Sequence, residues 1–182
     1  MKAEQKNMKM MTKTIAVLLL GAAMPALAAD QDVLPVNTDE FAQYRNVGEW
    51  GVHENLTRGS CFISRTDDAG HLVQIGLTKD NEYGYIGIFQ KGAKLEEGSN
   101  DVAIVVNGNL YVGVAKTVAH GASDAYVGCY GIANDKQLRL DLEKQKEMVV
   151  FPDKPFTITV NLDHVRNAIY EARECTKKLQ GS

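Results

Sequence analysis

The chain has 182 residues, with 23 acidic and 20 basic side chains and a formal net charge of −3 at pH 7. This balance lacks the basic excess that binding to nucleic acid or to anionic lipid head groups requires, so we expect neither kind of partner. No low-complexity linker or internal repeat divides the chain, and its length suits one domain with its own core.

Residues 1–29 have the pattern of a cleavable secretory signal peptide. Four lysines precede a short apolar run at residues 15–20, Pro25 interrupts the hydrophobic segment, and Ala26 and Ala28 are the small residues that signal peptidase accepts. The apolar run is too short to cross a bilayer as a helix, which disfavours a membrane anchor. Because the leader holds four lysines and one glutamate, its removal changes the net charge from −3 to −6. We expect a periplasmic or secreted protein that does not span a membrane after cleavage.

Short strand-like segments dominate the chain after the leader. We expect residues 30–45 to be a flexible lead-in, with a short ordered start at 40–44, and residues 46–182 to form one β-rich domain. Alternating apolar and polar residues between turn-forming clusters predict the strands. Asn107-Gly108 predicts a type I′ hairpin turn, because both residues tolerate positive φ angles. The predicted strands cover residues 50–54, 60–65, 72–79, 83–90, 102–106, 110–115, 125–131, 148–151 and 156–160.

Two segments have helical patterns. Asn134-Asp135 can cap a helix over 136–146, in which Leu138 and Leu142 lie one turn apart, although the alternation of Leu138, Leu140 and Leu142 leaves a strand as the competing interpretation. The C-terminal segment has an apolar stripe at helical spacing, formed by Val165, Ala168, Ile169, Ala172, Cys175 and Leu179. The sequence therefore predicts a mainly β fold, a single antiparallel β-sandwich or barrel-like domain with a C-terminal α-helix and one shorter helix.

Three cysteines remain after cleavage of the leader, so one of them has no intramolecular partner. We expect a disulfide between Cys61 and Cys175, because it would tether the C-terminal helix to the sheet, with a stabilisation of about 4 to 5 kcal/mol from loop closure. Cys129 would then be a buried thiol that packs as a small hydrophobe. Its alternative role as a thiolate nucleophile needs a neighbouring cation or histidine, and none is close in sequence.

Other combinations of reactive residues give weak signals. His120, Ser123 and Asp124 are the right residue types for acyl transfer, but they lie in one polar, glycine-containing loop, where solvated connecting residues are the usual occupants. The remaining histidines stand singly, without zinc-ligand spacing: His53, His71 and His164. The acidic turns at 67–68 and 80–82 lack the spacing of an EF-hand loop. We therefore predict no catalytic residues, no cofactor and no metal site.

Tyrosines on the predicted strands form the candidate binding surface. Alternation places Tyr83 and Tyr85 on one face of their strand, and Tyr126 and Tyr130 on one face of theirs. A tyrosine combines apolar area with a hydroxyl and can recognise sugars, peptides or proteins. The alternative is that these residues only pack across strand pairs.

Several segments carry a family resemblance: Trp50-Gly51-Val52, Cys61, residues 102–108, Gly128-Cys129, residues 135–151 and residues 156–162. In this pattern the chain resembles the small exported proteins of the invasion-associated locus B family. The resemblance implies a secreted or periplasmic β-sandwich protein of a Gram-negative bacterium, without an established catalytic residue set and linked to host-cell invasion or envelope functions. The chain departs from that family, which tends to have additional cysteines near its first and late strands, by carrying a long helix with Cys175.

Two functions follow as hypotheses. The first is a non-catalytic binding or interaction protein with a protein or cell-envelope ligand, favoured by a strand-rich domain that lacks a convincing set of acid, base and nucleophile. The second is a small exported hydrolase or thiol-dependent enzyme that uses Cys129 or Ser123 with a histidine. Labelling of the native protein by a thiol or serine probe separates the two.

Overall fold

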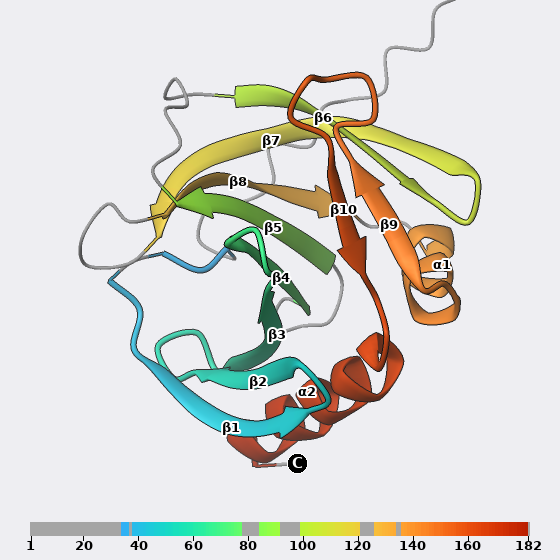
Figure 1. Ribbon diagram of the computed structural model, residues 1–182. Coiled ribbons are helices and arrows are strands. Elements are labelled where there is room, and N and C mark those ends of the chain that lie inside the picture. Colours follow the sequence, from blue (N-terminus) through green and yellow to red (C-terminus); the bar gives the residue numbers. More distant parts are fainter. Residues whose placement is uncertain are drawn as a thin grey trace, which may run out of the picture.

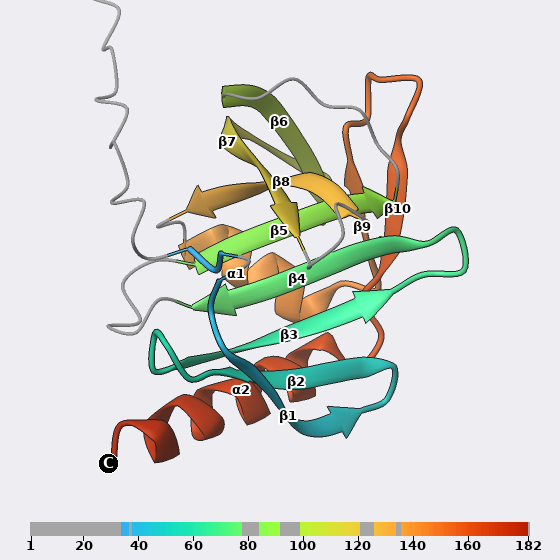
Figure 2. The same ribbon diagram turned by 90° about the vertical axis from the view of Figure 1, so that its left-hand side faces the viewer.

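The computed structural model describes residues 34–36, 38–77, 84–91, 99–120, 126–133 and 136–181. Within these ranges it describes the backbone alone for residues 99–100, 114, 116–120, 126–127, 129–130 and 132–133. Figures 1 and 2 show the fold from two directions. The elements are, in chain order, β1 (Phe41–Val47), β2 (Trp50–Asn55), β3 (Ser60–Thr66), β4 (His71–Leu77), β5 (Gly84–Lys91), β6 (Ser99–Val106), β7 (Asn109–His120), β8 (Tyr126–Ala133), α1 (Lys136–Lys144), β9 (Glu147–Val150), β10 (Ile158–Asn161) and α2 (Val165–Leu179).

The strands of the described part form one continuous antiparallel sheet in the order β1-β2-β3-β4-β5-β8-β7-β6-β9-β10. Figure 1 shows the sheet curling from β1 and β2 through β5 and β7 to β6, after which β9 and β10 descend on the far side of the core. The two halves of the sheet thus face each other, with sandwich-like packing. The predicted mainly β, antiparallel fold with two helices is confirmed.

The main core lies inside this curl, where alternate residues of each strand meet both helices. Trp50, Ile63 and Met148 are completely buried there. The Trp50 indole also donates a hydrogen bond of 3.0 Å to the Asp163 carbonyl oxygen, just before α2. Burial of an aromatic or large aliphatic side chain contributes about 1.5–3 kcal/mol each, so this core is the main source of stability.

A second, smaller core lies on the opposite face of the sheet and includes Leu34, Phe62, Tyr85 and Phe89. The Tyr85 ring lies over Gly76, its cross-strand partner, where an added Cβ would come within 2.3 Å of the ring. Tyr85 is only 3% exposed, because its ring fills the space left by Gly76. The prediction that Tyr85 belongs to a binding surface is therefore wrong. Tyr85 is therefore a packing residue.

The predicted disulfide between Cys61 and Cys175 is present, with the two Cα atoms 6.0 Å apart. It fastens α2 to β3, and the next residue of the helix adds a second link: the Cys61 N–H donates to the Thr176 hydroxyl at 2.8 Å. The predicted apolar stripe of α2 faces the core, and its members from Val165 to Cys175 are buried. Covalent and packing forces therefore hold the C-terminal helix in one place.

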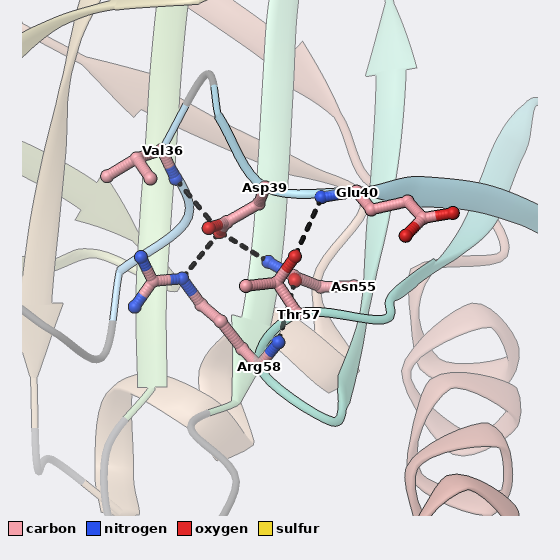
Figure 3. A network of polar contacts seen from close by, with 6 residues as sticks. All are labelled: Val36, Asp39, Glu40, Asn55, Thr57 and Arg58. Carbon is pink, nitrogen blue, oxygen red and sulfur yellow. Dashed lines mark hydrogen bonds and ion pairs between the residues drawn. The ribbon is translucent and has the colours of Figure 1, made fainter.

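The short ordered start predicted at 40–44 is part of strand β1, which covers Phe41–Val47, so the flexible lead-in does not extend to residue 45. Figure 3 shows what orders the approach to this strand: the Asp39 carboxylate accepts hydrogen bonds from Arg58, Asn55 and the Val36 N–H. Asp39 is only 9% exposed, and these bonds offset the cost of removing its charge from water. The predicted leader lies outside the described residues.

Within the described residues, the remaining predicted strands and helices are confirmed apart from their ends, whereas the predicted cap at Asn134-Asp135 lies outside those residues. The helix interpretation of 136–146 is correct, since α1 covers Lys136–Lys144. Asn107 and Gly108 have φ angles of 56° and 73°, as a type I′ turn requires. Strand β9 ends one residue earlier than predicted because Phe151 has a φ of 55°, outside the extended region.

Candidate functional site

The structure describes the side chains of only a few of the site residues predicted from the sequence. Tyr83 and Ser123 lie outside the described residues, and for Tyr126, Cys129 and Tyr130 the side chains do as well. Their backbone positions are defined by the sheet register. Tyr126 pairs with Lys91, Tyr130 with Gly87, and Cys129 with Ile88 of β5 and Thr117 of β7. The binding surface predicted for Tyr83, Tyr126 and Tyr130 therefore stays a prediction, whereas Tyr85 is buried and does not belong to it.

One serine–histidine contact appears that the sequence did not indicate. The Nε2 atom of His53 on β2 lies 2.8 Å from the Ser64 hydroxyl on β3. The His53 ring stacks on Phe62 with centroids 5.2 Å apart, and burial holds the pKa of this histidine below its usual value. Among the described residues no carboxylate contacts the other ring nitrogen, so the pair lacks the third group that orients a catalytic histidine. Only the register of two strands could have revealed this contact.

A second polar cluster surrounds Asp141 of α1. Its carboxylate accepts hydrogen bonds from Tyr111 at 2.6 Å, Asn109 at 2.7 Å, Gln137 at 2.8 Å and Asn107 at 3.0 Å. These bonds, led by those of Tyr111 and Asn109, lower the pKa of Asp141 to about 2. Because the carboxylate is completely covered and its acceptor positions are filled, the cluster fastens α1 to the β6–β7 turn and has no capacity left for a ligand.

Within the described part of the chain, an open cleft of about 440 Å³ is the candidate binding site. It lies between strands β6 and β7 and the β9–β10 loop, which stands beside β6 at the top of Figure 1. Its volume is within the range of about 300–1,000 Å³ that ligand pockets have. The cleft is lined by Asp101, Val102, Ala103, Val112, Gly113, Phe151, Pro152, Asp153 and Lys154.

The loop that forms one wall of this cleft is held in shape by its own contacts. The Phe151 N–H donates to the Ala103 carbonyl oxygen at 2.8 Å, which fixes the loop to β6. The Thr157 hydroxyl lies 2.9 Å and 2.8 Å from the carbonyl oxygens of Phe151 and Lys154. The Phe151 and Phe156 rings meet edge to face, with centroids 5.2 Å apart. The cleft is therefore preformed.

Phe151 itself has a φ of 55°, which is unusual for a residue with a bulky side chain. Such backbone strain persists only where the surroundings enforce it, and it concentrates at functional sites. Here the enforcing contacts are those of the β9–β10 loop, and the strained residue lines the cleft.

Large apolar side chains surround the cleft and face solvent. Val112 is 76% exposed, Leu110 61% and Phe156 51%. The register extends this apolar area across the sheet, because Val105 pairs with both Leu110 and Val149, and Ala103 pairs with Val112. Exposed apolar areas of this kind mark interaction sites on proteins. The sequence contained a signal for this surface: the apolar run at 102–106 suits a strand covered on both faces, and here one face is open.

Comparison with known proteins gives no family: no family model, no curated protein and no solved structure matches the chain. The described part of the chain contains no group of three or more residues placed to hold a metal ion. In the same residues, neither helix has the length and apolar character needed to cross a membrane. The geometry of the cleft is therefore the basis for a functional conclusion.

Proposed function

We propose that this protein is an exported, non-catalytic binding protein of the Gram-negative envelope, periplasmic or secreted, whose ligand site is the cleft between β6, β7 and the β9–β10 loop. The observation that carries the proposal is the set of exposed apolar side chains around a preformed cleft. A solvated apolar side chain such as Val112 contributes nothing to the fold while it faces water. Covering it by a partner would contribute roughly 25 cal/mol for each Å² removed from water.

Export is supported by two independent features. The first 29 residues have the pattern of a secretory signal, and the folded domain contains a disulfide between completely or almost completely buried cysteines. Structural disulfides are typical of proteins in oxidising compartments. Such a compartment also fits the resemblance to the invasion-associated locus B proteins, which we keep as a proposal.

A protein ligand agrees better with the site than a nucleic acid or an anionic lipid. The cleft has two acidic residues, Asp101 and Asp153, against one basic residue, Lys154. The mature part of the chain is acidic as well, with a net charge of −6 once the leader is removed. An apolar surface with this charge repels polyanions and accepts apolar or basic segments of another protein.

Site-specific photocrosslinking in the periplasm tests the proposal. A photoactivatable amino acid replaces Val112 in one strain and Tyr170 in a control strain. Tyr170 is 59% exposed and belongs to α2, the helix that lies at the opposite end of the molecule from the β9–β10 loop in Figure 1. We expect a discrete crosslinked partner at position 112 and none at 170. Equal yields at the two positions, or no product at either, would contradict the assignment of the site.

The alternative is a small exported hydrolase, and one contact favours it. Burial lowers the pKa of His53, which favours the neutral imidazole, and its Nε2 atom lies 2.8 Å from the Ser64 hydroxyl. A neutral imidazole in this position can accept the hydroxyl proton during acyl transfer. The test is labelling of the native protein by a fluorophosphonate, with Ser64→Ala as the control. Labelling that Ser64→Ala abolishes would establish the hydrolase, whereas unchanged labelling would point to Ser123. Cys129 needs a thiol-reactive probe as a separate test.

A further inference from the structure

Strand β6 is longer than the strand that pairs with its outer side. It runs from Ser99 to Val106, and β7 pairs with it along this whole length. On its other side, β9 pairs with Ile104–Val106 alone. Within the residues that the structure describes, no strand pairs with Ser99–Val102 on the side away from β7. Among the described residues, this segment of β6 therefore has one open edge, although β6 as a whole lies between β7 and β9 in the sheet.

The register shows which backbone groups face this open edge. In an antiparallel pair, the N–H and C=O of one residue point to the same side, and successive residues alternate. The Ala103 carbonyl oxygen faces β9, because it accepts the Phe151 N–H at 2.8 Å. Asp101 and Ser99 precede Ala103 by two and four residues, so their N–H and C=O groups point to the same side as those of Ala103. At these two positions that side is the open edge. Unpaired groups on a sheet edge are a template for a further strand.

The open edge and the cleft are one continuous site. Asp101, Val102 and Ala103 of β6 line the cleft, and Val112 of the adjacent strand forms its floor. The β9–β10 loop closes it at the point where β9 begins to pair with β6, through Phe151 and its bond to Ala103. A strand that continued the row of β9 along Ser99–Val102 would therefore begin next to Phe151, and one of its faces would lie on the same side of the sheet as Val112.

We propose that the ligand is an extended peptide segment of a partner protein, which adds to the open edge of β6 as an antiparallel strand. This inference rests on the function proposed above and names its ligand class. Backbone bonds to Asp101 and Ser99 provide the affinity, and the alternate side chains of the peptide provide the specificity. One apolar side chain enters the cleft between Val112 and Phe151.

Charge selects the peptide further. The residue opposite Asp101 in the added strand shares a sheet face with the Asp101 carboxylate, and opposite charges across a strand pair are favourable. Asp153 adds a second carboxylate on the rim, which Lys154 offsets only in part. Asp101 and Val112 lie on the same face of the sheet, because Ala103, two residues after Asp101, pairs with Val112. The preferred segment therefore carries a lysine or arginine and an apolar residue two positions apart. A second copy of this chain fits less well, because antiparallel pairing of two β6 edges brings two Asp101 carboxylates together.

The test uses fluorescently labelled peptides and the mature protein with its disulfide intact. One peptide of eight residues has valine and lysine in turn at every second position, with threonine between them, so that valine and lysine lie on one face. A second replaces lysine by glutamate, and a third keeps the side chains of the first but has alternate backbone amides N-methylated. We expect the first to bind, and the other two to bind on the order of tenfold more weakly or worse, since each lost backbone or charged bond weakens binding. Amide hydrogen exchange at Ser99–Val102 should slow when the first peptide binds.

Two variants of one residue separate backbone from charge effects. Asp101→Pro removes an N–H that faces the open edge and leaves the bonds of β6 to β7 in place, as proline at a sheet edge allows. Asp101→Asn keeps the N–H and removes the charge. We expect Asp101→Pro to abolish binding of every peptide, and Asp101→Asn to remove only the preference for lysine over glutamate. Circular dichroism and disulfide mapping check that both variants fold.

Three results would overturn the inference. Equal affinity for the N-methylated peptide would show docking by side chains alone, and failure of all three peptides would exclude strand addition. Self-association of the protein that Asp101→Pro abolishes would identify the occupant as a second copy. In each case, a specific crosslink at Val112 would still support the proposed binding function. If neither the crosslink nor peptide binding is observed, the proposed binding function itself is contradicted.

Discussion

Removal of the Cys61–Cys175 disulfide should lower the free energy of unfolding by up to about 5 kcal/mol. The two cysteines are 114 positions apart in sequence, and closing a loop of this length restricts the unfolded chain by about 5 kcal/mol in the chain-entropy treatment. The buried apolar face of α2 and the hydrogen bond from the Cys61 N–H to Thr176 persist without the bond. The variant should therefore still fold, with a lower unfolding midpoint.

The measurement is urea unfolding of the mature protein and of the Cys61→Ala/Cys175→Ala variant, followed by the fluorescence of Trp50. This residue is the only tryptophan of the chain, it is completely buried, and its indole bonds to the residue before His164 at the start of α2. Alanine is the suitable replacement because both cysteines are in the core, where a hydroxyl would lack a partner. Thr176→Val serves as a comparison that removes one nearby hydrogen bond and keeps the disulfide.

The comparison separates loop closure from local packing. Loss of the Thr176 hydroxyl should cost about 1–3 kcal/mol, because it leaves the buried Cys61 N–H unpaired. A double variant within about 1 kcal/mol of the wild type, at an unchanged denaturant slope, would refute the reasoning, since an ordinary surface substitution has an effect of that size. Disulfide mapping that found Cys129 bonded to either cysteine would refute it as well.

Three further predictions concern single side chains. Hydrogen bonds lower the pKa of Asp141 to about 2. The ionised Asp141 carboxylate should therefore stabilise the folded state above about pH 4, and this stabilisation should fade as the pH falls toward 2. Asp141→Asn should remove this pH dependence from the free energy of unfolding measured in urea. Gly76→Ala should cost about 1–3 kcal/mol in thermal or urea unfolding, because the new Cβ would collide with Tyr85, whereas Gly113→Ala, which meets no atom within 4 Å, should be close to neutral. Burial lowers the pKa of His53, so the folded state holds less proton there than the unfolded state, and stability should fall as the pH drops through about 6.5. NMR titration that placed His53 above that value, or a stability profile that His53→Gln left unchanged, would contradict this.

Local chemistry in the sequence determined most of the secondary structure. The positive φ angles that Asn107 and Gly108 accept defined the central hairpin, and the apolar stripe of 165–179 defined both the last helix and the face that it buries. The same stripe indicated that Cys175 faces the sheet, which made Cys61 its natural partner. These predictions succeeded because turn geometry and apolar periodicity depend on residues that are close in the chain.

The site depended on contacts between distant segments, which only the tertiary structure decides. Alternation assigned Tyr85 to a face of its strand, but the burial of that face comes from Leu34 and from the absence of a side chain at Gly76. Val112 shows the reverse case: it is an apolar residue of a predicted strand, and no described element covers it. A sequence period states which residues share a face of a sheet, whereas what lies over that face is fixed by the path of the whole chain. The cleft at β6 exists for that reason, because the β9–β10 loop meets β6 partway along its length and leaves the rest of its edge open.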